Sequence, residues 1–140
     1  MISDSFRLDH ALESIDPMVQ LLSAKAGRVL PPEAQGRFAI CVSEALTNLV
    51  LHSKNSNPDA QIQIELCEQD TAVTVEIYDP CGADPFDLRE YATDLSKLDV
   101  MAESGRGLGL IMACADHVTY DPVGNKHRLK LTINKEERVG

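Results

Sequence analysis

The chain has 140 residues and carries 13 Lys and Arg against 22 Asp and Glu, so its formal net charge at pH 7 is −9. Such an acidic chain is not expected to bind nucleic acid, because that affinity comes from basic patches that neutralise phosphates. Hydrophobic residues make up 44% and charged residues 25% of the chain, which is close to the average for globular proteins and predicts a single domain over residues 1–140.

Two features of the sequence bear on cellular location. No stretch approaches the roughly 20 apolar residues of a membrane span, and no basic run near the first residues leads into an apolar one. The sequence therefore predicts a cytoplasmic protein without membrane contact. Its four cysteines are far apart and form no CxxC pair, which favours reduced, mostly buried thiols, and no zinc-ligand spacing is present.

The first half of the chain has the apolar spacing of two helices. Apolar residues recur at intervals of mostly three and four over residues 17–29, with a proline at the first position. Pro31-Pro32 ends this helix and opens a second one, which is predicted at residues 33–52. The polar run at residues 53–59 is predicted to be a loop.

The pattern of apolar residues then changes to the alternation that is typical of β-strands. Three clear runs follow this pattern, at residues 61–66, 72–77 and 128–133. A short strand around Phe6 and Leu8 and an apolar helix over residues 108–115 are also expected. These elements predict an α/β two-layer sandwich, in which helices cover one face of a mixed, mostly antiparallel sheet.

The second predicted helix carries a polar stripe within an apolar segment. Glu44, Asn48 and His52 recur every four residues, so their side chains lie along one narrow face. A solvated helix face would have the same pattern, but the apolar neighbours indicate burial, and a buried carboxylate and amide need partners. An amide oxygen can ligate a hard cation and a carboxylate can accept a proton, which suits divalent-cation and phosphate chemistry.

A second candidate site follows the strand at residues 72–77. This strand runs into Asp79 and a turn that contains Gly82. An aspartate at a strand end can simply cap the turn. A fixed carboxylate beside a glycine can also accept a hydrogen bond from the exocyclic amine of a purine while the backbone approaches the ring.

Three glycines at alternate positions precede the apolar helix, in the run Gly105-Arg106-Gly107-Leu108-Gly109. Glycine allows positive φ, so backbone amides can point at an anion that the helix dipole also favours. The run lacks the GK[ST] of a Walker loop, and it does not directly follow a strand as a Rossmann loop would. A flexible hinge would have the same composition, so this run alone is weak evidence for phosphate binding.

Taken in this order, the three segments resemble the nucleotide-binding boxes of the GHKL ATPase superfamily, which includes gyrase, the Hsp90 chaperones, histidine kinases and MutL. The stripe from Glu44 to His52-Ser53 looks like the N box, Asp79 with Gly82 looks like the first glycine box, and residues 105–109 look like the second. The compact length, the ExxxNxxxHS form and the GRGLGL run are most similar to bacterial anti-sigma-factor serine/threonine kinases. The resemblance covers residues from about 6 to 135.

The resemblance implies a site for ATP and Mg²⁺, with roles for the matching residues. Glu44 would be the general base or polarising carboxylate, and Asn48 would bind Mg²⁺. Asp79 would receive the adenine amino group, and Arg106 would reach the terminal phosphate. The glycine-box residues expected at the nucleotide are Asp79, Gly82, Gly105, Arg106, Gly107, Leu108 and Gly109.

The resemblance also implies a function in partner switching. It suggests a serine/threonine protein kinase that phosphorylates a small STAS-like antagonist protein and binds a sigma factor when free of it. Phosphoryl transfer needs a Mg²⁺ ligand, amides around the phosphates and a carboxylate near the attacking hydroxyl, and the sequence supplies all three.

An alternative is a nucleotide-regulated binding module that exchanges protein partners without phosphoryl transfer. The first glycine box favours it, because Cys81 and Ala83 stand at the two glycine positions of the usual DxGxG pattern. Glu44 argues against this alternative, because a carboxylate near the phosphates is suited to proton transfer and not to binding an anion. Whether two copies associate as a homodimer is left open.

Overall fold

The computed structural model describes residues 2–52, 61–78, 111, 114–124 and 126–136. Ile111 and Cys114 are helical. In chain order, the elements are β1 (Ile2–Asp9), the short 3₁₀ helix η1 (Leu12–Ser14), α1 (Ile15–Ala26), α2 (Pro32–His52), β2 (Gln61–Glu68), β3 (Ala72–Tyr78), β4 (His117–Val123) and β5 (Lys126–Asn134).

The five strands form one sheet in the order β1-β2-β3-β5-β4. Each of the four pairings between these strands is antiparallel, in agreement with the prediction of a mixed but mostly antiparallel sheet; no parallel pairing occurs among the described residues. Short turns join β2 to β3 and β4 to β5, and strands joined in this way are necessarily antiparallel. The second of these turns contains Gly124 at φ +62°, a backbone conformation that glycine adopts without strain.

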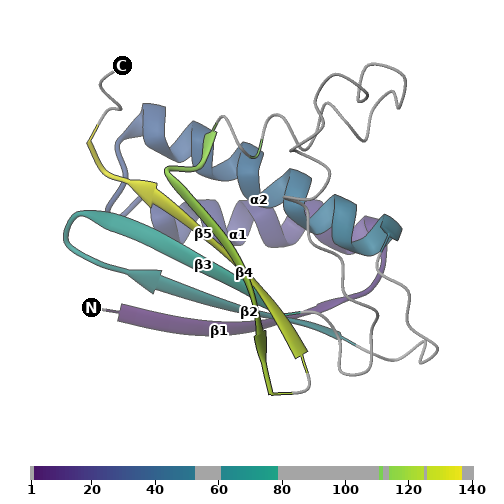
Figure 1. Ribbon diagram of the computed structural model, residues 1–140. Helices are drawn as coiled ribbons and strands as arrows, with labels where there is room; N and C mark the ends of the chain where they lie inside the picture. Colours follow the sequence, from purple (N-terminus) through teal and green to yellow (C-terminus); the bar gives the residue numbers. More distant parts are fainter. Residues whose placement is uncertain (1, 53–60, 79–110, 112–113, 125, 137–140) are drawn as a thin grey trace, which may run out of the picture.

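Both long helices cover the same face of the sheet, which gives the predicted two-layer α/β architecture (Figure 1). The register brings Leu66, Val75 and Leu131 side by side on that face. Phe38 and Leu46 of α2 are fully buried in the same core. Each such side chain contributes roughly 1.5–3 kcal/mol by leaving water, so this apolar interface holds α2 in place on the sheet.

Several boundaries differ from the predicted ones. β1 is longer than the short strand expected around Phe6 and Leu8, because it pairs along its whole length with β2. α1 ends at Ala26 rather than near Val29, because the amides of Val29 and Leu30 turn back to the Ala26 carbonyl. The expected loop at residues 53–59 lies outside the described residues.

β4 was not predicted, although Val118 and Tyr120 lie on the core side of the sheet opposite Leu131 and Leu129. Its sequence includes Pro122, which disfavours a strand. An edge strand tolerates proline because one side of its backbone makes no ladder hydrogen bonds.

Of the helix expected at residues 108–115, the structure describes Ile111, Cys114 and Ala115. The Ala115 amide donates to the Ile111 carbonyl at 3.0 Å, as in a helical turn.

In the described part of the chain, no helix is long and apolar enough to span a membrane.

Candidate functional site

Asn48 lies about one turn before the C-terminal end of α2 and is buried, with 4% of its surface exposed. Its Nδ2 donates a hydrogen bond to the main-chain carbonyl of Glu44 at 2.8 Å, which fixes the orientation of the amide. Within the described residues, no group donates a hydrogen bond to the Asn48 side-chain oxygen. The predicted burial of this amide is confirmed.

Glu44 lies one turn before Asn48 on the same helix face. Its side chain is half-buried, whereas the sequence predicted that it would be buried. Ile40, one turn before Glu44 on α2, is also 41% exposed. This part of α2 is therefore partly accessible to solvent. The Glu44 carboxylate forms no hydrogen bond or ion pair with the described part of the chain. The side chain of His52, at the end of α2, lies outside it.

The residues predicted to hold adenine and the phosphates lie outside the described residues. They are Asp79, Gly82, Gly105, Arg106, Gly107, Leu108 and Gly109. Their chain neighbours are described, however. β3, a central strand of the sheet, ends at Tyr78, directly before Asp79, and Ile111 follows two residues after Gly109.

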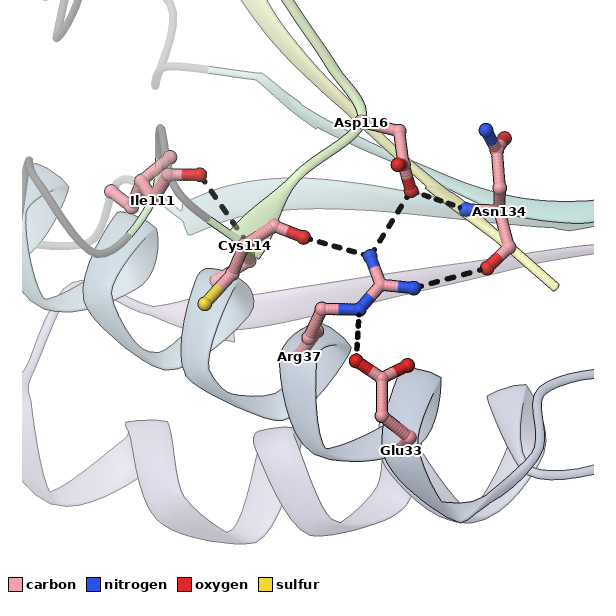
Figure 2. Close-up of polar contacts among 7 residues, drawn as sticks. Glu33, Arg37, Ile111, Cys114, Asp116 and Asn134 are labelled. Carbon is pink, nitrogen blue, oxygen red and sulfur yellow. Dashed lines mark hydrogen bonds and ion pairs between the residues drawn. The ribbon is translucent and has the colours of Figure 1, made fainter. Parts of the chain in front are cut away.

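Ile111 is the described residue nearest in sequence to the glycine run, and it is buried against α2. Its carbonyl accepts a hydrogen bond from Cys41 Sγ at 3.7 Å. One turn earlier on α2, Arg37 Nη1 donates to the Cys114 carbonyl at 3.1 Å (Figure 2). From Ile111 to Cys114, the chain therefore advances along α2 in the direction opposite to that of the helix.

Arg37, Cys41, Glu44 and Asn48 share one face of α2. Their separations of 4, 7 and 11 positions from Arg37 return each residue to within about 40° of the same direction. The face that contacts the segment after the glycine run is therefore the face that carries the two predicted site residues. The sequence analysis did not predict a role for Arg37. Its helical spacing from Glu44 and Asn48 is the signal that could have placed it on the same face as these two residues.

The contacts on this face shift the pKa of two side chains. Burial raises the pKa of the Cys41 thiol to about 12, with a further rise from neighbouring Cys114 and an opposing effect from Arg37. Burial of the Arg37 guanidinium acts to lower its pKa, but hydrogen bonds to Glu33 and Asp116 more than offset this and raise it. Cys41 is thus a neutral thiol and Arg37 a permanent cation. The three described cysteines are free, and of these only Cys41 is fully buried.

A comparison with protein families identifies the fold. Residues 8–131 match the model of the histidine kinase-like ATPase domain, which covers most of the chain. The chain belongs to the histidine kinase-like ATPase (GHKL) family. This membership implies that the domain binds ATP and uses it in an ATPase or phosphotransferase reaction. A search of curated proteins gave no match.

Within this ATPase domain, α2 supplies the helix on which the N box was predicted. The C-terminal half of α2 lies on the side of the molecule toward which β3 runs (Figure 1). β3 ends opposite Gln63, near the start of β2, and β2 is the next element after α2. The fold thus brings the end of β3 and the polar stripe of α2 to the same end of the domain.

Proposed function

We propose that this ATPase domain is a serine/threonine protein kinase, with Glu44 as the general base and Asn48 as a ligand of the Mg²⁺ that accompanies ATP. The observation that carries the proposal is the contrast between these side chains on one helix face. Asn48 is buried and oriented by its bond to the Glu44 carbonyl, whereas the Glu44 carboxylate is half-buried and unpaired among the described residues. About 6 Å of helix separates them.

Glu44 has the surroundings that a general base needs. A base must reach the proton of the attacking hydroxyl and must not be neutralised by a permanent partner. Neither a cation nor a hydrogen-bond donor from the described residues occupies the Glu44 carboxylate. It would take the proton of a serine or threonine hydroxyl as the oxygen of that hydroxyl bonds to the terminal phosphorus of the substrate ATP, while the bond from that phosphorus to the bridging oxygen breaks and ADP leaves.

Asn48 fits a role in holding Mg²⁺. Amide oxygens are hard donors, and Mg²⁺ usually keeps several waters and takes few protein ligands beside the substrate phosphates. The Asn48 amide donates an N–H to the Glu44 carbonyl, which orients the side chain, and its oxygen would be the atom that ligates the cation. When bound, Mg²⁺ neutralises charge on the phosphates during transfer.

We propose that the two glycine boxes complete this site, and chain connectivity supports their placement. Asp79 and Gly82, the first glycine box, would hold adenine. Asp79 directly follows the last residue of β3, so a strand of the sheet would fix its position. The second glycine box ends at Gly109, two residues before Ile111, and the Ile111 carbonyl accepts a hydrogen bond from Cys41 Sγ on α2. The residues proposed around the phosphates are Gly105, Arg106, Gly107, Leu108 and Gly109.

For partners, we propose a small STAS-like antagonist as the phosphorylated protein and a sigma factor as the protein held in its absence. The ExxxNxxxHS and GRGLGL motifs support this assignment through their resemblance to the anti-sigma-factor kinases. The net charge of −9 suits a partner with a basic face, because opposite charge speeds and orients association. These partners would place the protein in the cytoplasm.

The test is a phosphoryl-transfer assay with Mg-ATP and a small STAS-like protein encoded by a neighbouring gene. Mass spectrometry of the antagonist should show a phosphorylated serine or threonine. Glu44→Gln should lower the transfer rate by about a hundredfold or more, because it removes the base, while ATP affinity changes only by a small factor. Equal transfer rates for the wild type and this variant would show that Glu44 is not the base.

A further inference from the structure

Two cysteine side chains meet where α2 packs against the helical turn from Ile111 to Ala115. Cys41 is fully buried on α2, and its Sγ donates to the Ile111 carbonyl at 3.7 Å. The same carbonyl accepts the Ala115 amide at 3.0 Å, so it belongs to the turn that carries Cys114. The Cys114 side chain is a hydrogen-bonding neighbour of the Cys41 thiol, and both thiols are free.

A second contact fixes Cys114 against α2. Arg37, one turn before Cys41, donates from Nη1 to the Cys114 carbonyl at 3.1 Å (Figure 2). The same nitrogen donates to Asp116 Oδ2 at 3.1 Å, and that oxygen accepts the Asn134 amide at 2.7 Å. The fold therefore holds the two cysteines beside each other, and fixed proximity of two groups strongly favours a reaction between them.

The two thiols differ in their access to solvent. Cys114 is partly exposed, whereas Cys41 has no exposed surface, and burial keeps Cys41 protonated. An oxidant in solution therefore reaches Cys114 first, because oxidation of a thiol requires access to the sulfur. Cys41 is placed for the second step, in which a neighbouring thiol reacts with the oxidised sulfur.

We propose that Cys41 and Cys114 form a disulfide when the protein encounters a peroxide, and that this bond ties the turn from Ile111 to Ala115 to α2. In the first step, the Cys114 sulfur takes one oxygen from hydrogen peroxide, which leaves a sulfenic acid and releases water. In the second step, the Cys41 sulfur bonds to the Cys114 sulfur and the sulfur–oxygen bond breaks. The hydroxyl leaves as water with the proton of the Cys41 thiol. The two thiols lose two electrons in all, and one peroxide is reduced to two waters.

The disulfide should stabilise the folded domain. A disulfide restricts the unfolded chain, and this restriction increases with the length of the loop that the bond closes. The bond between Cys41 and Cys114 would close a loop of about half the chain. We therefore expect the oxidised protein to have a Tm higher by on the order of 10 °C, and we expect dithiothreitol to reverse the increase.

The experiment treats the purified full chain with hydrogen peroxide and then maps its cysteines. The remaining thiols are blocked with N-ethylmaleimide in denaturant, and the non-reduced peptides are identified by mass spectrometry. The peptides that contain Cys41 and Cys114 should be joined, and the Tm should rise. In Cys41→Ala, the Tm should not rise, and the Cys114 sulfenic acid should persist and react with dimedone, because its partner thiol is absent.

Cys67→Ser is the matched control. Cys67 is also a partly exposed free thiol, but it follows Leu66 on β2, and the Leu66 side chain lies in the core. Successive side chains of a strand point to opposite faces, so the sheet separates Cys67 from Cys41. This variant should keep both the joined peptides and the full rise in Tm after peroxide treatment.

Two results would overturn the inference. One is that peroxide leaves Cys41 and Cys114 as free thiols, or converts Cys114 to a sulfinic acid, without joining the two residues. The other is that Cys114 becomes joined to Cys67 or Cys81 instead of Cys41. Should Cys41→Ala not fold, Cys114→Ala decides the question, and a peroxide-induced rise in Tm that persists in that variant contradicts the inference.

Discussion

At the scale of single residues, Cys41 connects protonation with stability. It is fully buried on α2, it donates to the Ile111 carbonyl, and burial raises its pKa from 9.0 to about 12. Between these two values, the unfolded chain releases the thiol proton while the folded protein keeps it. The free energy of unfolding must therefore fall as the pH rises from about 9 to about 12.

We expect this loss to disappear when the thiol is removed. Between pH 8 and pH 11, the wild type should lose about 3 kcal/mol of unfolding free energy more than Cys41→Ala does, because two pH units above the unfolded pKa carry about that much energy. Urea denaturation at fixed pH values gives both curves. Parallel pH dependence in the two proteins would mean that Cys41 ionises equally in the folded and unfolded states.

The candidate site shows which residues a sequence can indicate. Glu44 and Asn48 were predicted because their spacing of four is a local property of the chain, and the structure describes both on one face of α2. Arg37 was not predicted, because its partners Cys114 and Asn134 are 77 and 97 residues away in sequence. Only the folded chain shows that such distant groups meet.

At the scale of elements, predictability followed the regularity of each pattern. β2 and β5 were predicted because apolar and polar residues alternate cleanly along strands with one buried face. The sequence of β3 alternates in the same way, although its first four residues are all buried. β4 was missed because it is an edge strand whose residues are mostly exposed, so its sequence is under little constraint to alternate. The full length of β1 was also missed, because pairing with β2 decides where it begins and ends.

The junction between α1 and the sheet gives a prediction at this scale. Arg28, in the turn after α1, makes two hydrogen bonds to the Glu68 carboxylate at the end of β2, and that carboxylate is only 3% exposed. Arg28→Met should lower the free energy of unfolding by about 2 kcal/mol, because a buried charged acceptor is left without its partner. Glu68→Met should cost less, because it removes the buried charge and leaves a half-exposed guanidinium that water can solvate. Urea denaturation of both variants measures the difference. Equal losses of unfolding free energy would show that an unpaired Glu68 carboxylate is no more costly than an unpaired Arg28 guanidinium.

At the scale of the whole molecule, the fold is built from contacts between distant parts of the chain. β1 pairs with β2 although both long helices lie between them in the sequence. The pairing runs from Ile2 opposite Glu68 to Asp9 opposite Gln61. The chain around Ile111 and Cys114 is fixed to α2, and Asp116 is fixed to β5. A ligand that binds where these parts meet engages only the folded chain. Nucleotide binding should therefore stabilise the domain as a whole.

This linkage provides a test of the magnesium ligand that needs no partner protein. At a free Mg-ADP concentration about 100 times its Kd, binding adds about 2.7 kcal/mol to the free energy of unfolding, which raises the Tm of a domain of this size by on the order of 10 °C. In the wild type, replacing Mg²⁺ by EDTA should remove most of this increase, because the phosphates then lose the cation that they share with Asn48.

Asn48→Ala should show a small increase that is the same with Mg²⁺ and with EDTA, whereas Glu44→Gln should retain the magnesium dependence of the wild type. Thermal melts followed by circular dichroism give all of these values. A full magnesium-dependent rise in Asn48→Ala would exclude this side chain as the ligand and would leave its buried amide with only the structural role of its bond to the Glu44 carbonyl.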